Sequence, residues 1–253
     1  MQIAEWRPPA GTVRSDACFI HVHVPRTGGT TLRNVLFGRL STRLKSDEIF
    51  LVDLLSDRYR TGSVDDFEGL SSDELRRLRF VSGHAPLRFA EHVPRPFTFA
   101  VLREPVDRSL SVYWYCFHNP QHPAHAHARS MSPVEFITGG WGEARNGQAR
   151  YLSGYAFTTE SPSDDQLLDA TEIALERLSY IGFFDSLRTV VRDMCRAVGT
   201  RPPLTIPRTN AAPRQPISRR DLIRIEACNA ADIALYKLAL ERWGDYDPSL
   251  LFV

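Results

Sequence analysis

Residues Phe19 to Leu36, FIHVHVPRTGGTTLRNVL, combine the features of an anion-binding turn. An apolar, β-branched run breaks at Pro25, two glycines and two threonines follow, and a helical pattern begins after Thr30. The start of a helix offers unpaired backbone N–H groups and the positive end of the helix dipole. Glycines let the backbone approach an anion closely, and arginine adds a fixed positive charge. The pattern suits a site for one compact, doubly charged group, and an ordinary strand-to-helix turn is the equal alternative for the turn taken by itself. The residues that we expect to contact it are Arg26, Thr27, Gly28, Gly29, Thr30 and Thr31.

This turn differs from the phosphate loop of nucleotide triphosphatases. That loop reads GxxxxGK[ST], with a lysine for the β and γ phosphates and a serine or threonine for magnesium, and the pair is missing here. A triphosphatase often carries an aspartate after a neighbouring strand to hold magnesium, whereas the strand PFTFAVLR ends in Arg103. We therefore expect no metal site. A nucleotide or small-molecule kinase stays an alternative, which a magnesium requirement for turnover would favour.

A second anion site is predicted in LREPVDRSLSVYWY. Arg103 stands at the tip of the strand, and Ser111 follows eight positions later, inside the next helix. An arginine at a strand tip and a serine two helical turns on can converge on one phosphate. The sequence thus predicts two anion sites in succession along the chain.

These two segments resemble the nucleotide-binding motifs of sulfotransferases. PRTGGTT resembles the 5′-phosphosulfate loop of that family, and LREPVDRSLSVYWY resembles its 3′-phosphate motif. The donor in that family is 3′-phosphoadenosine 5′-phosphosulfate (PAPS), which requires two anion sites and no magnesium. The sequence is most similar to the carbohydrate-type group that includes heparan sulfate 2-O-sulfotransferase; VSGHAP, NGQARYLSG and RTNAAPR are similar to further segments of it. The resemblance implies transfer of a sulfuryl group from PAPS to an acceptor hydroxyl, with adenosine 3′,5′-bisphosphate as the product.

The resemblance also implies roles for single residues. His84 falls at the position of the family's catalytic histidine, and an imidazole titrates near neutrality, so it can accept the acceptor's proton. Arg26 stands where the family has a lysine; because arginine cannot release a proton, we expect it to stabilise charge on the leaving phosphate. Arg208 lies in a late segment, RTNAAPR, part of which covers the nucleotide in the family. It is expected at the 3′-phosphate.

Other polar residues are weaker candidates. His23 and Glu104 are the reserve candidates for the base, and a structural role for His84 itself is the alternative to catalysis. Four histidines, His118, His122, His125 and His127, occur in the segment HNPQHPAHAHARS. Its prolines and small residues predict a mobile loop over the acceptor site rather than a metal site. The residues that bind zinc normally have ordered hydrogen-bond partners of their own. Gln148, Arg150 and Tyr151 are expected in the cleft, and most of Tyr113, Trp114, Tyr115 and Phe117 in the core.

The elements that must position these residues alternate along the chain. Strand patterns in ACFIHVHV, FVSGH, PFTFAVLR and YIGFFD are separated by helical patterns. This order predicts an α/β fold with a P-loop-like, mostly parallel central sheet flanked by helices on both faces. Ser71 begins a capping-box pattern, which predicts a helix over roughly 72–79. The last long helix is expected from about Arg219 to Trp243, after Ser218 and before Gly244.

Composition sets the remaining expectations. The 253 residues, 43% of them apolar, suit a single domain over 1–253 with a flexible segment over 1–16. A net charge of +1 gives no case for nucleic acid. Four scattered cysteines without a CxxC pair indicate reduced thiols in a cytoplasmic protein, and no apolar run is long enough for a membrane span. The acceptor (a sugar, glycolipid or small metabolite) and the oligomeric state stay open, and a nucleotide-binding module without catalysis is the second alternative.

Overall fold

A sheet of parallel strands forms the centre of the protein. The computed structural model describes residues 16–53, 56, 59–206 and 215–244. Within them six strands lie in the order β3-β2-β4-β1-β5-β6, and every neighbouring pair is parallel. The arrangement confirms the predicted α/β fold. The strands are β1 Cys18–Val22, β2 Ile49–Val52, β3 Arg60–Gly62, β4 Phe80–Gly83, β5 Pro96–Leu102 and β6 Tyr180–Phe183.

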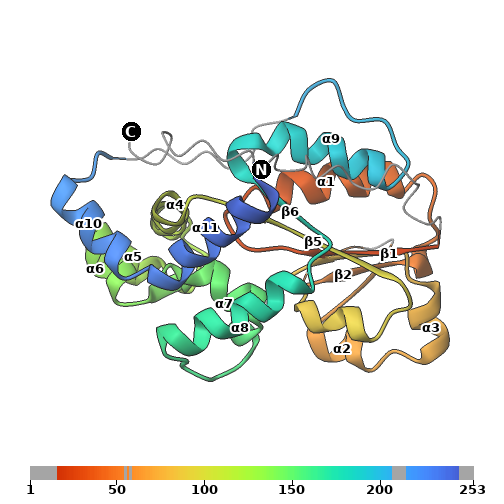
Figure 1. Cartoon of the computed structure of the whole chain (residues 1–253), viewed down its shortest axis with the longest axis horizontal. Coiled ribbons are helices and arrows are strands. Elements are labelled where there is room, and N and C mark those ends of the chain that lie inside the picture. The colour runs from red at the N-terminus through yellow and green to blue at the C-terminus, as the bar shows by residue number, and fades with distance from the viewer. Residues whose placement is uncertain (1–15, 54–55, 57–58, 207–214, 245–253) are drawn as a thin grey trace.

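Helices cover both faces of this sheet (Figure 1). One face carries α1, Gly29–Leu40, and α9, Leu187–Ala197. Alternate residues of β1 point to opposite faces, so that Phe19 joins this core while Ile20 and Val22 join the other. Because both faces are buried, the strands are nearly continuous apolar runs. The other face is covered by α2 Val64–Glu68, α3 Ser72–Arg77, α7 Gly147–Ser153, α8 Asp164–Glu176 and α11 Ala230–Trp243.

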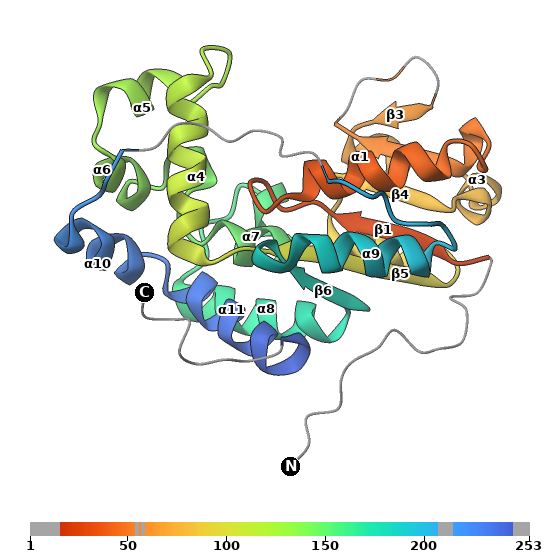
Figure 2. The ribbon, with the colours of Figure 1, turned by 90° about the horizontal axis from the view of Figure 1, so that it is seen from above.

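Further helices lie beyond the carboxyl ends of the strands. Figure 2 shows α4 running across these ends, with α5, α6 and α10 beside it. They share a third apolar core that contains Trp114, Phe136 and Ile225. In the described parts of the chain no helix is long and apolar enough to cross a membrane. The helices beyond the strand ends are α4 Pro105–His118, α5 His125–Ser130, α6 Pro133–Thr138 and α10 Arg219–Ala227. Short 3-10 turns lie at η1 Ser46–Glu48, η2 Leu87–Glu91, η3 Trp141–Glu143, η4 Tyr155–Phe157 and η5 Phe184–Ser186.

The helix that begins at Ser72 has the predicted capping box. The Ser71 hydroxyl accepts the N–H of Glu74, and the Glu74 carboxylate accepts the N–H of Ser71. The helix ends at Arg77, two residues earlier than expected, because Leu78 turns to ψ 136° and buries its side chain in the core. One buried leucine therefore determines this boundary.

The predicted single helix from Arg219 to Trp243 is wrong, since α10 and α11 are separate helices. The chain leaves the helix at Asn229, whose side chain is fully buried. Its amide oxygen accepts the N–H of Asn146, and its amide nitrogen donates to the carbonyl of Ile225. The break thus gives a buried polar side chain its partners.

The histidine-rich segment is partly helical and packed, not a mobile loop throughout. Ala124 and Ala128 stand four residues apart, and both are buried against the third core as α5 forms. The His127 ring stacks on Trp141 with 3.6 Å between the ring centroids. The small residues that predicted a loop stand at helical spacing, which lets α5 pack closely on this core.

The backbones of β2 and β4 lie so close together at Gly83 that there is no room for a side chain. Its φ is +132°, and an added Cβ would lie 2.1 Å from the carbonyl oxygen of Val52. We expect Gly83→Ala to lower the free energy of unfolding by roughly 3 kcal/mol in urea titrations, because backbone atoms must move.

Gly38→Ala is the matched control. Gly38 lies in α1 with nothing within 4 Å of an added Cβ, so alanine should stabilise by up to about 1 kcal/mol. A Gly83→Ala protein within about 0.5 kcal/mol of the wild type, the range of an ordinary surface change, would contradict the described contact.

Candidate active site

The residues singled out for chemistry meet at the carboxyl edge of the sheet. The loop 23–28 follows β1, His84 follows β4, and Arg103 follows β5. β4 and β5 are the two neighbours of β1. In open parallel sheets ligands bind outside this edge, so the strand order alone assembles a candidate site. Arg208, Asn210 and Arg214 lie outside the described residues, as does 1–15 of the predicted flexible segment.

The turn after β1 ends at an uncapped helix. Gly28, the residue before α1, has φ +87°, and an added Cβ would lie 2.9 Å from a ring carbon of Phe184. It has no side chain with which to cap the first N–H groups of the twelve-residue helix. Arg26 also has a positive φ of 69°, a strained conformation for a residue with a Cβ. Such strain, imposed by the surrounding structure, is found at ligand-binding turns.

The carbonyl groups of this turn are held by other parts of the protein. Arg108 Nε donates to the Pro25 carbonyl at 3.2 Å, and Arg103 Nη1 donates to the Arg26 carbonyl at 3.0 Å. The Thr27 hydroxyl donates to the carbonyl of Val24 at 2.9 Å. In a trans peptide the next N–H points away from the carbonyl. The turn therefore directs its N–H groups away from these arginines, and the buried Thr27 hydroxyl closes the turn.

The two arginines of the site each have their own partners. Arg26 Nε donates to the Ser111 hydroxyl at 3.3 Å, and its guanidinium lies 4.5 Å from the ring centroid of Tyr115. Arg103 Nε donates to Asp107 at 2.5 Å, and its guanidinium lies over the ring of Phe184. The structure thus brings Ser111 against Arg26, although the sequence analysis paired it with Arg103. Two positive centres stand side by side, joined through the Arg26 carbonyl.

Three histidine rings follow one another from the interior of the sheet to its edge. The ring centroids of His21 and His23 are 5.4 Å apart, and those of His23 and His84 are 5.7 Å apart. The side chain of His84 is 43% exposed, while His23 is 7% exposed and packs on Gly29. An acceptor can therefore reach His84 and not His23. Tyr151 flanks His84 on its other side, at 5.9 Å between the centroids.

Burial lowers the pKa of His84 from its usual 6.5, and the nearby carboxylates of Glu143 and Asp53 oppose that shift. Burial also holds the pKa of His23 well below its usual value, with a further contribution from His21. Both rings are therefore neutral at pH 7. A neutral, partly exposed imidazole is the form that accepts a proton.

Glu104, the other reserve base, is occupied as a helix cap. Its carboxylate accepts the N–H groups of Val106 and Asp107 at the start of α4. Burial raises the pKa of Glu104, although these two hydrogen bonds oppose the shift. The geometry accounts for Glu104 as a structural residue and leaves His84 as the candidate base.

The cleft residues predicted from NGQARYLSG divide by role. The Gln148 side chain accepts the N–H of Arg103 and donates to its carbonyl, both at 2.9 Å, so it holds the tip of β5. Arg150 donates to the carbonyls of Tyr155 and Glu160, away from the histidines. Of these three residues, Tyr151 is the one whose ring lies against His84, the candidate base. Arg108 and Asp53 were not predicted as site residues, and Tyr115 was named only among residues expected mostly in the core. Asp107 was not predicted either, although its position four residues after Arg103 is a spacing at which side chains can meet.

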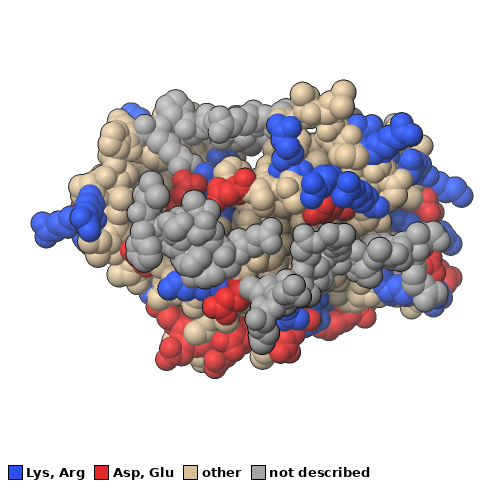
Figure 3. Space-filling view, turned by 45° about the horizontal axis from the view of Figure 1, so that its top comes forward, with Lys and Arg blue, Asp and Glu red and all other residues tan. Residues whose placement is uncertain are grey.

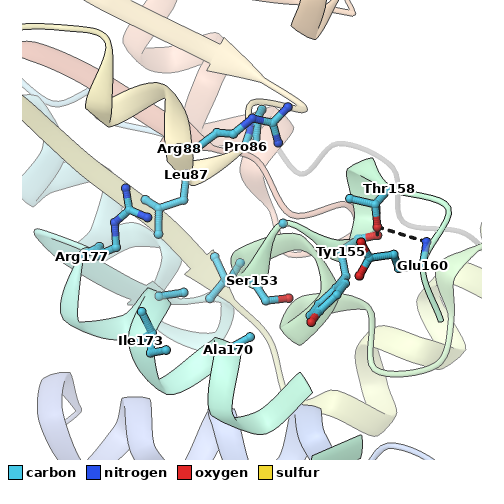
Figure 4. A pocket seen from close by; sticks show the side chains of 13 residues that line it. Pro86, Leu87, Arg88, Ser153, Tyr155, Thr158, Glu160, Ala170, Ile173 and Arg177 are labelled. Atoms are coloured by element: carbon cyan, nitrogen blue, oxygen red, sulfur yellow. Dashed lines mark hydrogen bonds between the residues drawn. The ribbon is translucent and has the colours of Figure 1, made fainter. Parts of the chain in front are cut away.

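A separate pocket lies below the site, between η2 and the ends of α7 and α8 (Figure 4). Its apolar lining includes Leu87, Leu152 and Ile173, and Arg88 and Arg177 lie at its rim. Among the described residues, none of those predicted for catalysis or the donor lines this pocket. Among the described residues no group of three or more histidine, cysteine or acidic side chains could hold a metal ion, the histidine-rich segment included.

Comparisons with known proteins found similarity in structure and none in sequence. No protein-family model matches, and no curated protein matches. A sulfotransferase from Alicyclobacillus acidocaldarius is similar in structure at 15% sequence identity and a TM-score of 0.48, over 87% of this chain and 94% of that one. Mouse sulfotransferase SULT7A1 complexed with PAP is similar at 16% identity and a TM-score of 0.38, over 85% of this chain and 65% of that one. Likeness at these scores carries no argument about activity, so the residues of the site must carry it.

The buried histidines make a prediction about stability and pH. Burial lowers the pKa of His21 to about 3, and its Nδ1 is hydrogen-bonded to the Ser82 hydroxyl at 2.9 Å. A histidine that is neutral when folded takes up a proton on unfolding below pH 6.5, so its contribution is present above that pH and lost as the pH falls toward the folded pKa. As the pH is lowered from 7 to 5, the free energy of unfolding should fall by about 2 kcal/mol for each of His21 and His23.

The double variant His21→Phe, Ser82→Ala has no His21 to protonate on unfolding, so only the protonation of His23 remains. We expect urea titrations to show that it loses about 2 kcal/mol less than the wild type between these pH values. Ser82→Ala alone keeps His21 and should retain the wild-type pH dependence. Equal pH dependence in all three proteins would mean that His21 is not held neutral.

Proposed function

We propose that this protein is a sulfotransferase that moves a sulfuryl group from PAPS to an acceptor hydroxyl. The observation that carries the proposal is the meeting of three features at one sheet edge: the uncapped start of α1, the paired cations Arg26 and Arg103, and the partly exposed, neutral His84. The first two suit a donor with two separate anionic groups. The third suits a hydroxyl that must lose a proton.

The residues present fit the donor. The N–H groups at the start of α1 and the charge of Arg26 would hold its 5′ phosphosulfate. Arg103 would hold the 3′-phosphate, for which Asp107 must move aside, because a carboxylate and a phosphate repel each other. Ser111 would act through Arg26, whose guanidinium it contacts. Arg208 stays the expected further contact of the 3′-phosphate.

Charge on the surface agrees with an anionic donor. Figure 3 shows many lysine and arginine side chains on the right of the view, on the side of α1 and α9, and acidic side chains mostly along the lower edge, with a smaller acidic group left of the centre. α9 carries Arg188, Arg192 and Arg196 four residues apart, whereas α8 is acidic. The near-neutral total charge therefore hides an asymmetry that favours approach of an anion from the α1 side.

The chemical step follows from these positions. The acceptor oxygen forms a bond to sulfur as the bond between sulfur and the phosphate oxygen breaks. His84 takes the proton of the hydroxyl, and the electron pair of the broken bond stays on the phosphate. Arg26 and the α1 N–H groups stabilise that growing charge. The proposed acceptor is a hydroxyl group of a sugar, a glycolipid or a small metabolite.

The two anion sites predict which nucleotide binds. Adenosine 3′,5′-bisphosphate should bind more tightly than adenosine 5′-phosphate in calorimetry. Arg103→Ala should weaken binding of the bisphosphate by roughly 10–100-fold and binding of the monophosphate less, since the 5′ site loses only the contact of Arg103 with the Arg26 carbonyl. Arg76→Ala, at an exposed arginine on α3, is the matched control and should change neither. Equal affinity of the wild type for both nucleotides would reject the assignment of Arg103.

If His84 is the base, its removal should lower the rate of sulfate transfer without weakening nucleotide binding. His84→Ala should lower sulfate transfer from labelled PAPS by about 10²–10⁴, the usual worth of a positioned base, and leave bisphosphate affinity unchanged. His92→Ala, at an exposed histidine, should leave both unchanged. A folded His84→Ala protein with the wild-type rate on an alkyl alcohol would transfer the role elsewhere. Bisphosphate binding by the wild type without transfer to any of a panel of sugars, glycolipids and alcohols would indicate a non-catalytic module.

A further inference from the structure

Asp53 lies beside the candidate base at the carboxyl end of β2. Its Oδ2 is 4.0 Å from Nδ1 of His84, and the two side chains are 48% and 43% exposed. This is an ion-pair distance, longer than a direct hydrogen bond. The carboxylate therefore acts on the ring mainly through its charge.

Sheet geometry places the two residues together. β2 and β4 are neighbours, and Val52 pairs with Gly83 at their ends. Asp53 and His84 are therefore the first residues after the two strands. The Asp53 N–H donates to the Gly62 carbonyl at 3.0 Å. Its φ is +54°, a left-handed conformation that aspartate and asparagine adopt more readily than most residues. The backbone at Asp53 is thus fixed by β3 on one side and by β4 on the other.

We propose that Asp53 is the positioning residue of His84. Its carboxylate favours the imidazole tautomer with hydrogen on Nδ1, which leaves the lone pair on Nε2 for the acceptor hydroxyl. It also stabilises the imidazolium that forms when Nε2 takes the proton. Asp53 acts through His84 and needs no contact with the substrate; this role rests on the proposed function.

Other groups also act on His84, and they limit what Asp53 can change. Burial lowers the pKa of His84; Glu143 and Asp53 oppose that effect, and Arg33 adds to it. Since Glu143 stays in an Asp53 variant, part of the opposing charge remains. The titratable and charged groups that face His84 are Asp53 from β2, His23 from β1, Arg33 from α1, Glu143 from η3 and Tyr151 from α7.

Asp53→Asn removes the charge and keeps both the shape and the left-handed backbone preference. NMR titration of the His84 ring should show its pKa moved further down in the variant, since a negative neighbour is lost. Asp169→Asn removes an equal charge from an exposed position in α8 and should leave the titration unchanged. Equal His84 titrations in Asp53→Asn and Asp169→Asn would overturn the proposal.

Turnover gives a second readout. In Asp53→Asn the acid limb of kcat/KM should move to lower pH, and the plateau should fall about tenfold because the base is weaker. The melting temperature and bisphosphate affinity should stay at wild-type values. An unchanged plateau with an unchanged acid limb would overturn the proposal.

The wild type supplies a test that needs no variant. Nitrogen NMR of His84 at neutral pH should show a hydrogen on Nδ1 and none on Nε2; the opposite tautomer would overturn the proposal even if Asp53→Asn failed to fold. Neither NMR experiment depends on turnover. Failure of the wild type to transfer sulfate would therefore reject the proposed function and leave the Asp53–His84 contact to be judged separately.

Discussion

The buried guanidinium of Arg108 is the interaction on which the site depends. Arg108 has no exposed surface; its Nε donates to the Pro25 carbonyl and its Nη1 to the Glu143 carbonyl at 2.7 Å. One side chain thereby joins the anion turn after β1 to the η3 segment that flanks His84. A buried cation is costly without hydrogen bonds and a counter-charge. Burial lowers the pKa of Arg108, and the carboxylate of Asp232 is the largest opposing influence.

That counter-charge extends the same network to the second arginine. Asp232 is fully buried and accepts the N–H groups of Gln148 and Ala149 at the start of α7. Gln148 in turn holds the backbone of Arg103. Space is tight as well, because a Cβ on Gly147 would lie 2.1 Å from the Arg108 guanidinium. The anion turn, the η3 segment and the tip of β5 are thus joined by one buried set of polar contacts rather than by loops alone.

Local signals allowed much of this to be predicted from the sequence. The Gly28–Gly29 turn and the Ser71 cap act through nearby backbone, so their positions could be read directly. The strands β2 and β3, of four and three residues, were not among the strands predicted from the sequence. Without β2 in the sheet order, the approach of Asp53 to His84 could not be foreseen.

Tertiary contacts explain what else was missed. Ser111 lies two helical turns from Arg103, and this spacing gave no sign that Arg26, in the strained turn, would contact the Ser111 hydroxyl. Arg108 stands in a polar part of a helix, and nothing nearby in the sequence marks it as buried. Its partners, Pro25 and Glu143, come from distant segments, so only the assembled fold identifies it.

A crystal structure with adenosine 3′,5′-bisphosphate tests the central claim most directly. The account predicts the 5′-phosphate at the N–H groups that begin α1, beside Arg26, and the 3′-phosphate on Arg103 with Asp107 moved away from it. A nucleotide bound elsewhere, or bound with the Arg103–Asp107 pair intact, would contradict the account.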